Sequence, residues 1–140
     1  MEVLTSITTG SAAALTISLL LRPLWNVAAH RSAMLPEQAV WIGSSSRAEA
    51  MYLGAHALAG AAQGLLFWLS WGLAALTTMS WWLQGLAVGA AFATLLVLPI
   101  ILICSSVIRV DRKVLWVLCG ETVATCISVG LACSWHWMQR

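Results

Sequence analysis

The stretch EAMYLGAHALAGAAQGLLFWLSWGLAAL, residues 49–76, decides the fold of this chain. Within it a polar residue recurs at every seventh position, and small or apolar residues fill the intervals. The polar positions are Glu49, His56, Gln63 and Ser70, with Thr77 just beyond the stretch. Seven residues turn an α-helix about 20° short of two full turns, so these side chains form one narrow stripe. The pattern predicts a membrane helix that turns this stripe toward protein and its remaining surface toward hydrocarbon.

The composition extends this interpretation to the whole chain. Of its 140 residues, 61% are hydrophobic and 9% are charged, whereas soluble domains carry about 25% charged residues. The charged residues are clustered and leave apolar runs of about 20 residues, which are typical of membrane-spanning helices. We therefore expect one all-α integral membrane domain over residues 1–140. Its four transmembrane helices are predicted at 3–29, 47–76, 81–108 and 114–135.

The longest connection, residues 30–47, contains one more predicted element. Pro36 stands near the start of the segment 36–43 and Gly43 stands at its end, which is the usual order at helix termini. Trp41 and Ile42 would hold such a helix on the membrane surface. The expected fold is thus a four-helix membrane bundle with a short interfacial helix between the first and second spans.

The positively charged residues set the expected topology. Four spans place the connections 30–47 and 109–113 on one side of the membrane, together with six of the seven Lys and Arg residues. Only Arg140 lies on the other side. Cytoplasmic segments of membrane proteins carry an excess of Lys and Arg. We therefore expect both connections in the cytoplasm and both termini outside it.

Small residues one helical turn apart predict close contacts between helices. Gly60 and Gly64 have this spacing in the second predicted helix, and Gly85 and Gly89 have it in the third. Such pairs let another backbone approach closely. In the last predicted helix Gly130 shares a face with three cysteines, Cys119, Cys126 and Cys133. Because neighbouring cysteines lie about 10 Å apart along the helix, we expect no metal site or local disulfide there. The opposite face is polar, so this helix is expected to be central or to meet another subunit.

His56 and Glu121 are the ionisable side chains that lie well inside predicted spans. Each is about 10–12 Å from the cytoplasmic helix end, so we expect them at one depth and facing each other. Gln63 lies on the stripe of His56, and Thr125 and Ser128 share the face of Glu121. An ionised carboxylate facing lipid costs at least about 2.5–3.5 kcal/mol, so Glu121 is either protonated or paired. The alternative is structural, with a neutral His56 bonded to a helix carbonyl or hydroxyl.

Arg22 and Glu49 form a candidate ion pair near the same membrane face. Ser11, Ser18 and Arg22 follow helical spacing and mark a side of the first helix that faces protein. Glu49 has a second interpretation, because Ser46-x-x-Glu49 matches a capping box in which the carboxylate accepts a bond from the cap residue's N–H.

Several features of the second half of the chain recur in a known group of proteins. They are Gly85 and Gly89, the basic loop that runs into Lys113-Val114-Leu115-Trp116, and then Gly120, Gly130 and Trp135. With these features the chain resembles an uncharacterised family of small four-helix bacterial membrane proteins, known only as a domain of unknown function. The resemblance implies a bacterial inner-membrane location and brings no activity. That family tends to have Asn and Tyr-His where this chain has residues 118–122, so a His-based role there does not transfer.

These observations favour a structural or interaction role in the membrane. We expect a small subunit or assembly factor that packs among lipids against itself, as a homo-oligomer, or against a larger membrane complex. The rivals are a small proton-coupled carrier that uses His56 and Glu121, and a binder of a lipid-soluble ligand such as a pigment, quinone or sterol-like molecule. The chain has no nucleophile elbow, phosphate loop or H-E-x-x-H motif, which favours a non-enzymatic role. Nothing in it points to nucleic acid or defines a cofactor.

Overall fold

The computed structural model describes residues 2–31, 46–72, 79–107 and 112–139, and this part of the chain is all-helical with no strand. Two long helices come first, α1 (Glu2–Arg31) and α3 (Ser46–Gly72). A continuous helical run follows, composed of α4 (Trp81–Phe92), the π-helical turn η2 (Ala93–Val97) and α5 (Leu98–Val107). The last helix is α6 (Arg112–Met138). The interfacial helix expected at 36–43 lies outside the described residues.

Three of these segments are long and apolar enough to cross a membrane: Glu2–Pro23, Trp81–Ile103 and Leu115–Met138. α3 has 27 residues but does not join them. Its polar side chains Tyr52, His56 and Gln63, together with many small residues, lower its mean hydropathy. The helical class is therefore confirmed, and three helices with the length and apolar character of membrane spans are observed. The described residues do not establish the fourth span expected from the sequence.

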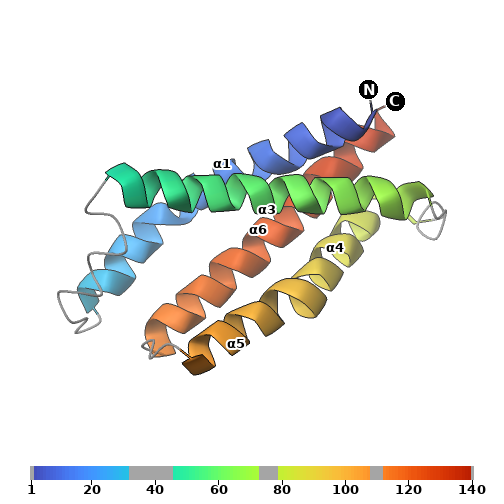
Figure 1. Ribbon diagram of the computed structural model, residues 1–140. Helices are drawn as coiled ribbons and strands as arrows, with labels where there is room; N and C mark the ends of the chain where they lie inside the picture. The colour runs from blue at the N-terminus through green and yellow to red at the C-terminus, as the bar shows by residue number, and fades with distance from the viewer. Residues whose placement is uncertain (1, 32–45, 73–78, 108–111, 140) are drawn as a thin grey trace.

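The helices alternate in direction, and α6 lies at the centre (Figure 1). The two chain ends lie together at one end of the bundle, where α1 begins and α6 ends (Figure 1). There the Sγ of Cys133 contacts the carbonyl oxygen of Ser6 at 3.8 Å, and Trp137 Nε1 donates to Ser6 Oγ at 3.2 Å. α6 packs against α1, α3 and α4, while α3 crosses α1 and α6 obliquely. Of the two positions expected for the last helix, the central one is observed.

Close backbone contacts join α1 to α3 at three glycines. A Cβ on Gly60 would lie 2.6 Å from the Cβ of Ala14 and would overlap the carbonyl of Gly10. A Cβ on Gly64 would overlap the backbone of Ser6. These separations are shorter than any side chain tolerates, so the two helices can meet here only because the residues are glycines.

A second seam of the same kind joins α4 to α6. A Cβ on Gly85 would lie 2.7 Å from the Cα of Leu131, and a Cβ on Gly89 would lie 2.7 Å from the carbonyl oxygen of Cys126. Gly130 of α6 faces the carbonyl of Gly85 from the other side. The small residues expected to form packing seams therefore join helices of the same chain. They are not available to a second subunit.

Pro99 accounts for the π-helical turn in the third helical run. Proline lacks the N–H that would bond the carbonyl four residues earlier, and its ring crowds that turn. The sequence predicts a kink in this half of the helix, and the structure accommodates Pro99 through the wider turn η2 just before it. Ala93, at the start of η2, is buried.

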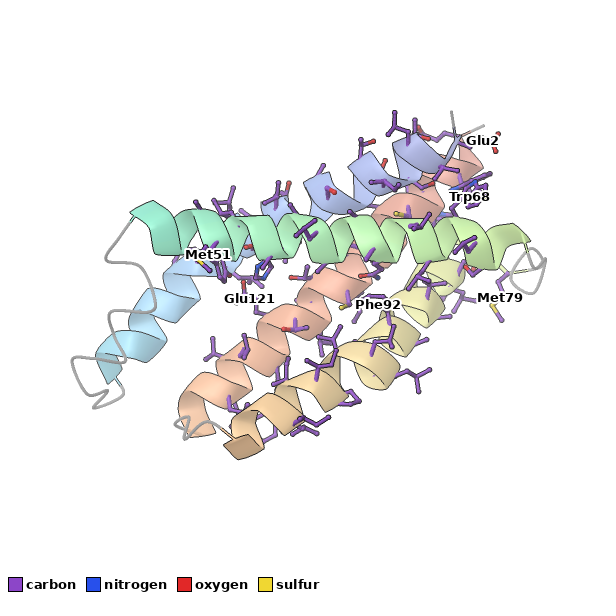
Figure 2. All side chains as sticks on the ribbon, in the orientation of Figure 1. Glu2, Met51, Trp68, Met79, Phe92 and Glu121 are labelled. Atoms are coloured by element: carbon purple, nitrogen blue, oxygen red, sulfur yellow. The ribbon has the colours of Figure 1, made fainter. Side chains whose placement is uncertain are left out.

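Polar residues lie inside the bundle and large apolar residues lie outside it. The buried polar side chains are Ser6, Ser18, Gln63, Gln84, Glu121, Thr125 and Ser134. The apolar core is small and consists of Ala14, Phe67, Val129 and Cys133. Leucine, isoleucine and tryptophan side chains project outward along the helices (Figure 2). This is the distribution expected where the surroundings offer no hydrogen-bond partners, so polar groups must find them within the protein.

Candidate functional site

The candidate site is a cluster of three side chains from two helices. α3 supplies Tyr52 and His56, which are four residues apart and therefore share one face of the helix. Their rings stack in a tilted arrangement with centroids 4.3 Å apart. α6 supplies Glu121, which lies between α6 and the first half of α3 (Figure 2). The glycine seam along α1 keeps α3 close to the bundle, and this closeness brings the two helices' side chains together.

The carboxyl of Glu121 is the centre of the cluster. Its side chain is only 2% exposed, and its Oε1 accepts a hydrogen bond from the hydroxyl of Tyr52. The same oxygen lies 3.4 Å from Nε2 of His56. This separation is longer than a normal N–H···O hydrogen bond but within the range of an ion pair. The structure thus brings together the two ionisable residues that the sequence places at one depth.

The backbone fixes which nitrogen of His56 carries a proton. Nδ1 lies 3.0 Å from the carbonyl oxygen of Tyr52, and because a carbonyl can only accept, Nδ1 must carry the hydrogen. Nε2 then faces Glu121 either as a lone pair or as a second N–H. An ionised Glu121 beside a neutral His56 would oppose a lone pair to an anion and leave a net charge in an apolar place. One further proton removes both problems, whether it lies on the carboxyl or on the ring.

Two hydroxyl groups flank this cluster. Ser18 of α1 is fully buried and lies beside the phenol of Tyr52 without the geometry of a hydrogen bond. Thr125 lies one helical turn beyond Glu121 on α6 and is 6% exposed. Neither hydroxyl has a hydrogen-bond partner among the described residues. Arg22, one turn after Ser18, is close enough for its charge to act on Tyr52.

The other residues predicted for the site separate from it. Gln63 is buried, but its Nε2 donates to the carbonyl oxygen of Cys126 at 2.5 Å and so links α3 to α6 beyond the cluster. Ser128 is half-buried on α6. The side chain of Glu49 lies outside the described residues, so its pairing with Arg22 and its alternative capping role both stay predictions. Of the predicted polar residues, the structure brings His56 and Glu121 into contact, and Thr125 lies one turn beyond Glu121 on α6.

Sequence reasoning missed Tyr52. It is the one tyrosine of the chain, and near the start of a membrane helix a tyrosine resembles an ordinary interfacial aromatic residue. The signal that could have identified it is its spacing, since the residue four positions before His56 must lie on the same face. In the described residues no group of three His, Cys, Asp or Glu side chains could hold a metal ion.

No protein-family model, no curated protein and no solved structure matches this chain. The resemblance to uncharacterised four-helix proteins therefore adds nothing to the functional argument, which rests on the geometry alone. That geometry combines three helices that are long and apolar enough to cross a membrane with a buried cluster of carboxyl, imidazole and phenol groups.

Proposed function

We propose that this chain is a small proton-coupled carrier in which Glu121 and His56 share an exchangeable proton. The observation that carries the proposal is the double contact at Oε1 of Glu121, with the phenol of Tyr52 on one side and Nε2 of His56 on the other. An isolated ionised carboxylate inside a membrane costs at least about 2.5–3.5 kcal/mol. An ionisable side chain inside a membrane is a functional-site candidate by default, and proton relays are one of the roles that such side chains have.

The roles of the three residues follow from their contacts. Glu121 is the proton carrier, because it is the most deeply buried of the ionisable groups in the cluster. His56 is the exchange partner, because its Nε2 lies 3.4 Å from the carboxyl oxygen of Glu121 and an imidazole can both take up and release a proton. Tyr52 is a positioning residue, since its hydroxyl donates to the carboxyl and stabilises it whether or not the shared proton is on the ring.

We further propose that α3 is a fourth membrane span. Its 27 residues extend to about 40 Å at 1.5 Å per residue, which exceeds the hydrocarbon thickness of about 30 Å. Tyr52, His56 and Gln63 all make contacts inside the bundle, while Met51, Leu58 and Leu69 are exposed. An outward apolar face is what a lipid-facing helix requires, even where the average along the whole helix is modest.

We also propose the topology that the charges indicate, which agrees with four membrane spans. An even number of spans brings the two termini to one side, in keeping with the adjacent chain ends in Figure 1. The excess of Lys and Arg near the connections 30–47 and 109–113 supports a cytoplasmic position for both. The termini would then lie outside the cytoplasm, and we propose the bacterial inner membrane as the location.

Proton movement in lipid vesicles tests the carrier. The purified chain is reconstituted in vesicles loaded with a pH-sensitive dye, and a pH gradient is imposed with the membrane potential clamped. We expect proton flux above that of protein-free vesicles, and its loss in Glu121→Gln, because an amide cannot release a proton at this site. Glu2→Gln is the matched control, since Glu2 is an exposed carboxyl at the start of α1. Equal flux in the wild type and Glu121→Gln would refute the proposal.

A second candidate is the membrane subunit or assembly factor that the sequence favours. The glycine seams are used within the chain, so a partner needs another surface. One is present on the outer side of α3, where Gly54 has open space around it and Ala55, Ala59 and Ala62 are exposed. Small exposed residues of this kind suit helix association in lipid. A mass measured in mild detergent that is larger than one chain, and reduced by Gly54→Leu, would support this candidate. No observation among the described residues favours the lipid-soluble ligand over these two.

A further inference from the structure

Two buried hydroxyls beside the proton-sharing pair have no partner in the described part of the chain. They belong to Ser18 of α1, which is 0% exposed, and Thr125 of α6, which is 6% exposed. Buried polar groups in folded proteins are almost always hydrogen-bonded, and where protein partners are lacking an ordered water molecule takes their place. The two hydroxyls therefore indicate that something small and polar occupies this part of the bundle.

The register of the helices places Ser18 at the level of Glu121, and Thr125 lies one turn further along α6. α1 and α6 are antiparallel and meet where Cys133 contacts the carbonyl of Ser6. Twelve residues along α1 and twelve back along α6 from that contact lead to Ser18 and Glu121. α1 also bonds to α3, where Ser11 donates to the carbonyl of Ala57 at 3.1 Å. Two turns further along α1, Ser18 comes close to the level of Tyr52, beside which it lies. Three helices thus converge on one polar place.

This place is closed toward one end of the bundle. Beyond Thr125 along α6, Gln63 bonds the carbonyl of Cys126, and the apolar cluster of Ala14, Phe67, Val129 and Cys133 follows. Toward the other end the next charged group on α1 is Arg22, which acts on Tyr52. Both hydroxyls therefore lie between this apolar cluster and the bundle end at Arg22.

We propose that an internal water molecule hydrogen-bonds Ser18, Thr125 and the carboxyl of Glu121, and relays protons between the Glu121–His56 pair and the bundle end at Arg22. The relay rests on the proposed function. In one transfer the water gives a proton to a carboxyl oxygen of Glu121 through one O–H bond. It takes a proton from the next water molecule toward Arg22, so the relay water is unchanged and bulk water supplies the proton. The opposite transfer reverses both steps.

Replacing the hydroxyls tests the relay water. Thr125→Val and Ser18→Ala remove the groups with little change in shape, and Thr94→Val is the matched control because its hydroxyl is exposed and bonds its own helix at Ala90. If the Thr125 hydroxyl holds water, Thr125→Val lowers the melting temperature relative to Thr94→Val. If the hydroxyl is truly unpaired, removing it leaves the melting temperature unchanged or raises it. A melting temperature of Thr125→Val that is equal to or higher than that of the wild type overturns the proposal.

Infrared spectra separate the relay from the carrier. The wild-type spectrum minus that of Glu121→Gln isolates the Glu121 band, and transfer to D₂O gives the rate at which its proton exchanges. We expect at least a several-fold slower exchange in Thr125→Val and in Ser18→Ala, and little further slowing in the double variant, because both hydroxyls hold one water. Unchanged exchange in these variants would eliminate the relay alone. If the wild-type spectrum contains no exchangeable band that Glu121→Gln removes, the shared proton and the proposed carrier are refuted together with the relay.

Discussion

Replacing Glu121 by leucine or by glutamine should have very different costs, although both changes remove the same charge. In Glu121→Leu the hydroxyl of Tyr52 loses its acceptor, and Nε2 of His56 loses its contact with the carboxyl oxygen. An unsatisfied buried polar group costs about 1–3 kcal/mol. His56 keeps its bond from Nδ1 to the backbone carbonyl, so its share lies at the low end of that range.

The expected cost of Glu121→Leu is therefore about 2–4 kcal/mol of unfolding free energy, which is at least a 30-fold change in the folding equilibrium. Glutamine keeps the contact with Tyr52, because its carbonyl oxygen still accepts from the phenol, and a rotation of the side chain lets its amide donate to Nε2 of a neutral His56. We expect that change to cost less than about 1 kcal/mol. The gap between the two variants measures the hydrogen-bonding role of the carboxyl separately from its charge.

Unfolding by sodium dodecyl sulfate in mixed micelles, followed by the fluorescence of the nine tryptophans, measures both variants. Adding Tyr52→Phe provides an internal control. In the Glu121→Leu background it removes the hydroxyl that leucine leaves unpaired, so it should recover about 1 kcal/mol, whereas alone it should destabilise. Equal stability of the glutamine and leucine variants would refute the reasoning, and so would additive effects in the double variant.

Two further predictions concern packing and topology. Gly64→Leu should prevent α3 from reaching α1 and lower the melting temperature sharply, because Gly64 faces the backbone of Ser6. Gly54→Leu should leave the melting temperature nearly unchanged, because Gly54 has open space around it. Equal melting of the two variants would contradict the seam. Cysteines introduced at Ser45 and Asp111 should react with a reagent applied to the cytoplasmic side, and a cysteine at either terminus should react from outside. A terminus labelled from the cytoplasmic side would overturn the four-span count.

The sequence predicts the helices and one essential contact of the site, for physical reasons that are easy to state. Apolar runs of about 20 residues have few alternatives to a membrane helix, and an acid and an imidazole at one depth have few partners other than each other. His56 and Glu121 accordingly meet in the structure. Gln63 follows the same stripe but bonds the backbone carbonyl of Cys126, because two turns along α3 it has moved to another level of α6.

Other features depend on which helices are neighbours, and local patterns do not encode that. The spacing of Gly60 and Gly64 predicts a close contact but carries no information about the partner, which is α1 of the same chain. Tyr52 was missed because its spacing from His56 gains meaning only when Glu121 stands opposite. Ser18 was predicted to face protein, yet its place beside Tyr52 follows only from the register between α1 and α3.

The central position of α6 has a consequence for the order in which the bundle is assembled during synthesis. α1 and α3 are made first and can join through their own glycine seam, since segments made earlier can fold before later ones leave the ribosome. The run from α4 to α5 has α6 as its principal neighbour, so it must wait in the bilayer until α6 is inserted. Tyr52 and His56 wait as well, because their acceptor arrives on that same helix. The final insertion thus closes the bundle and completes the polar cluster in a single event.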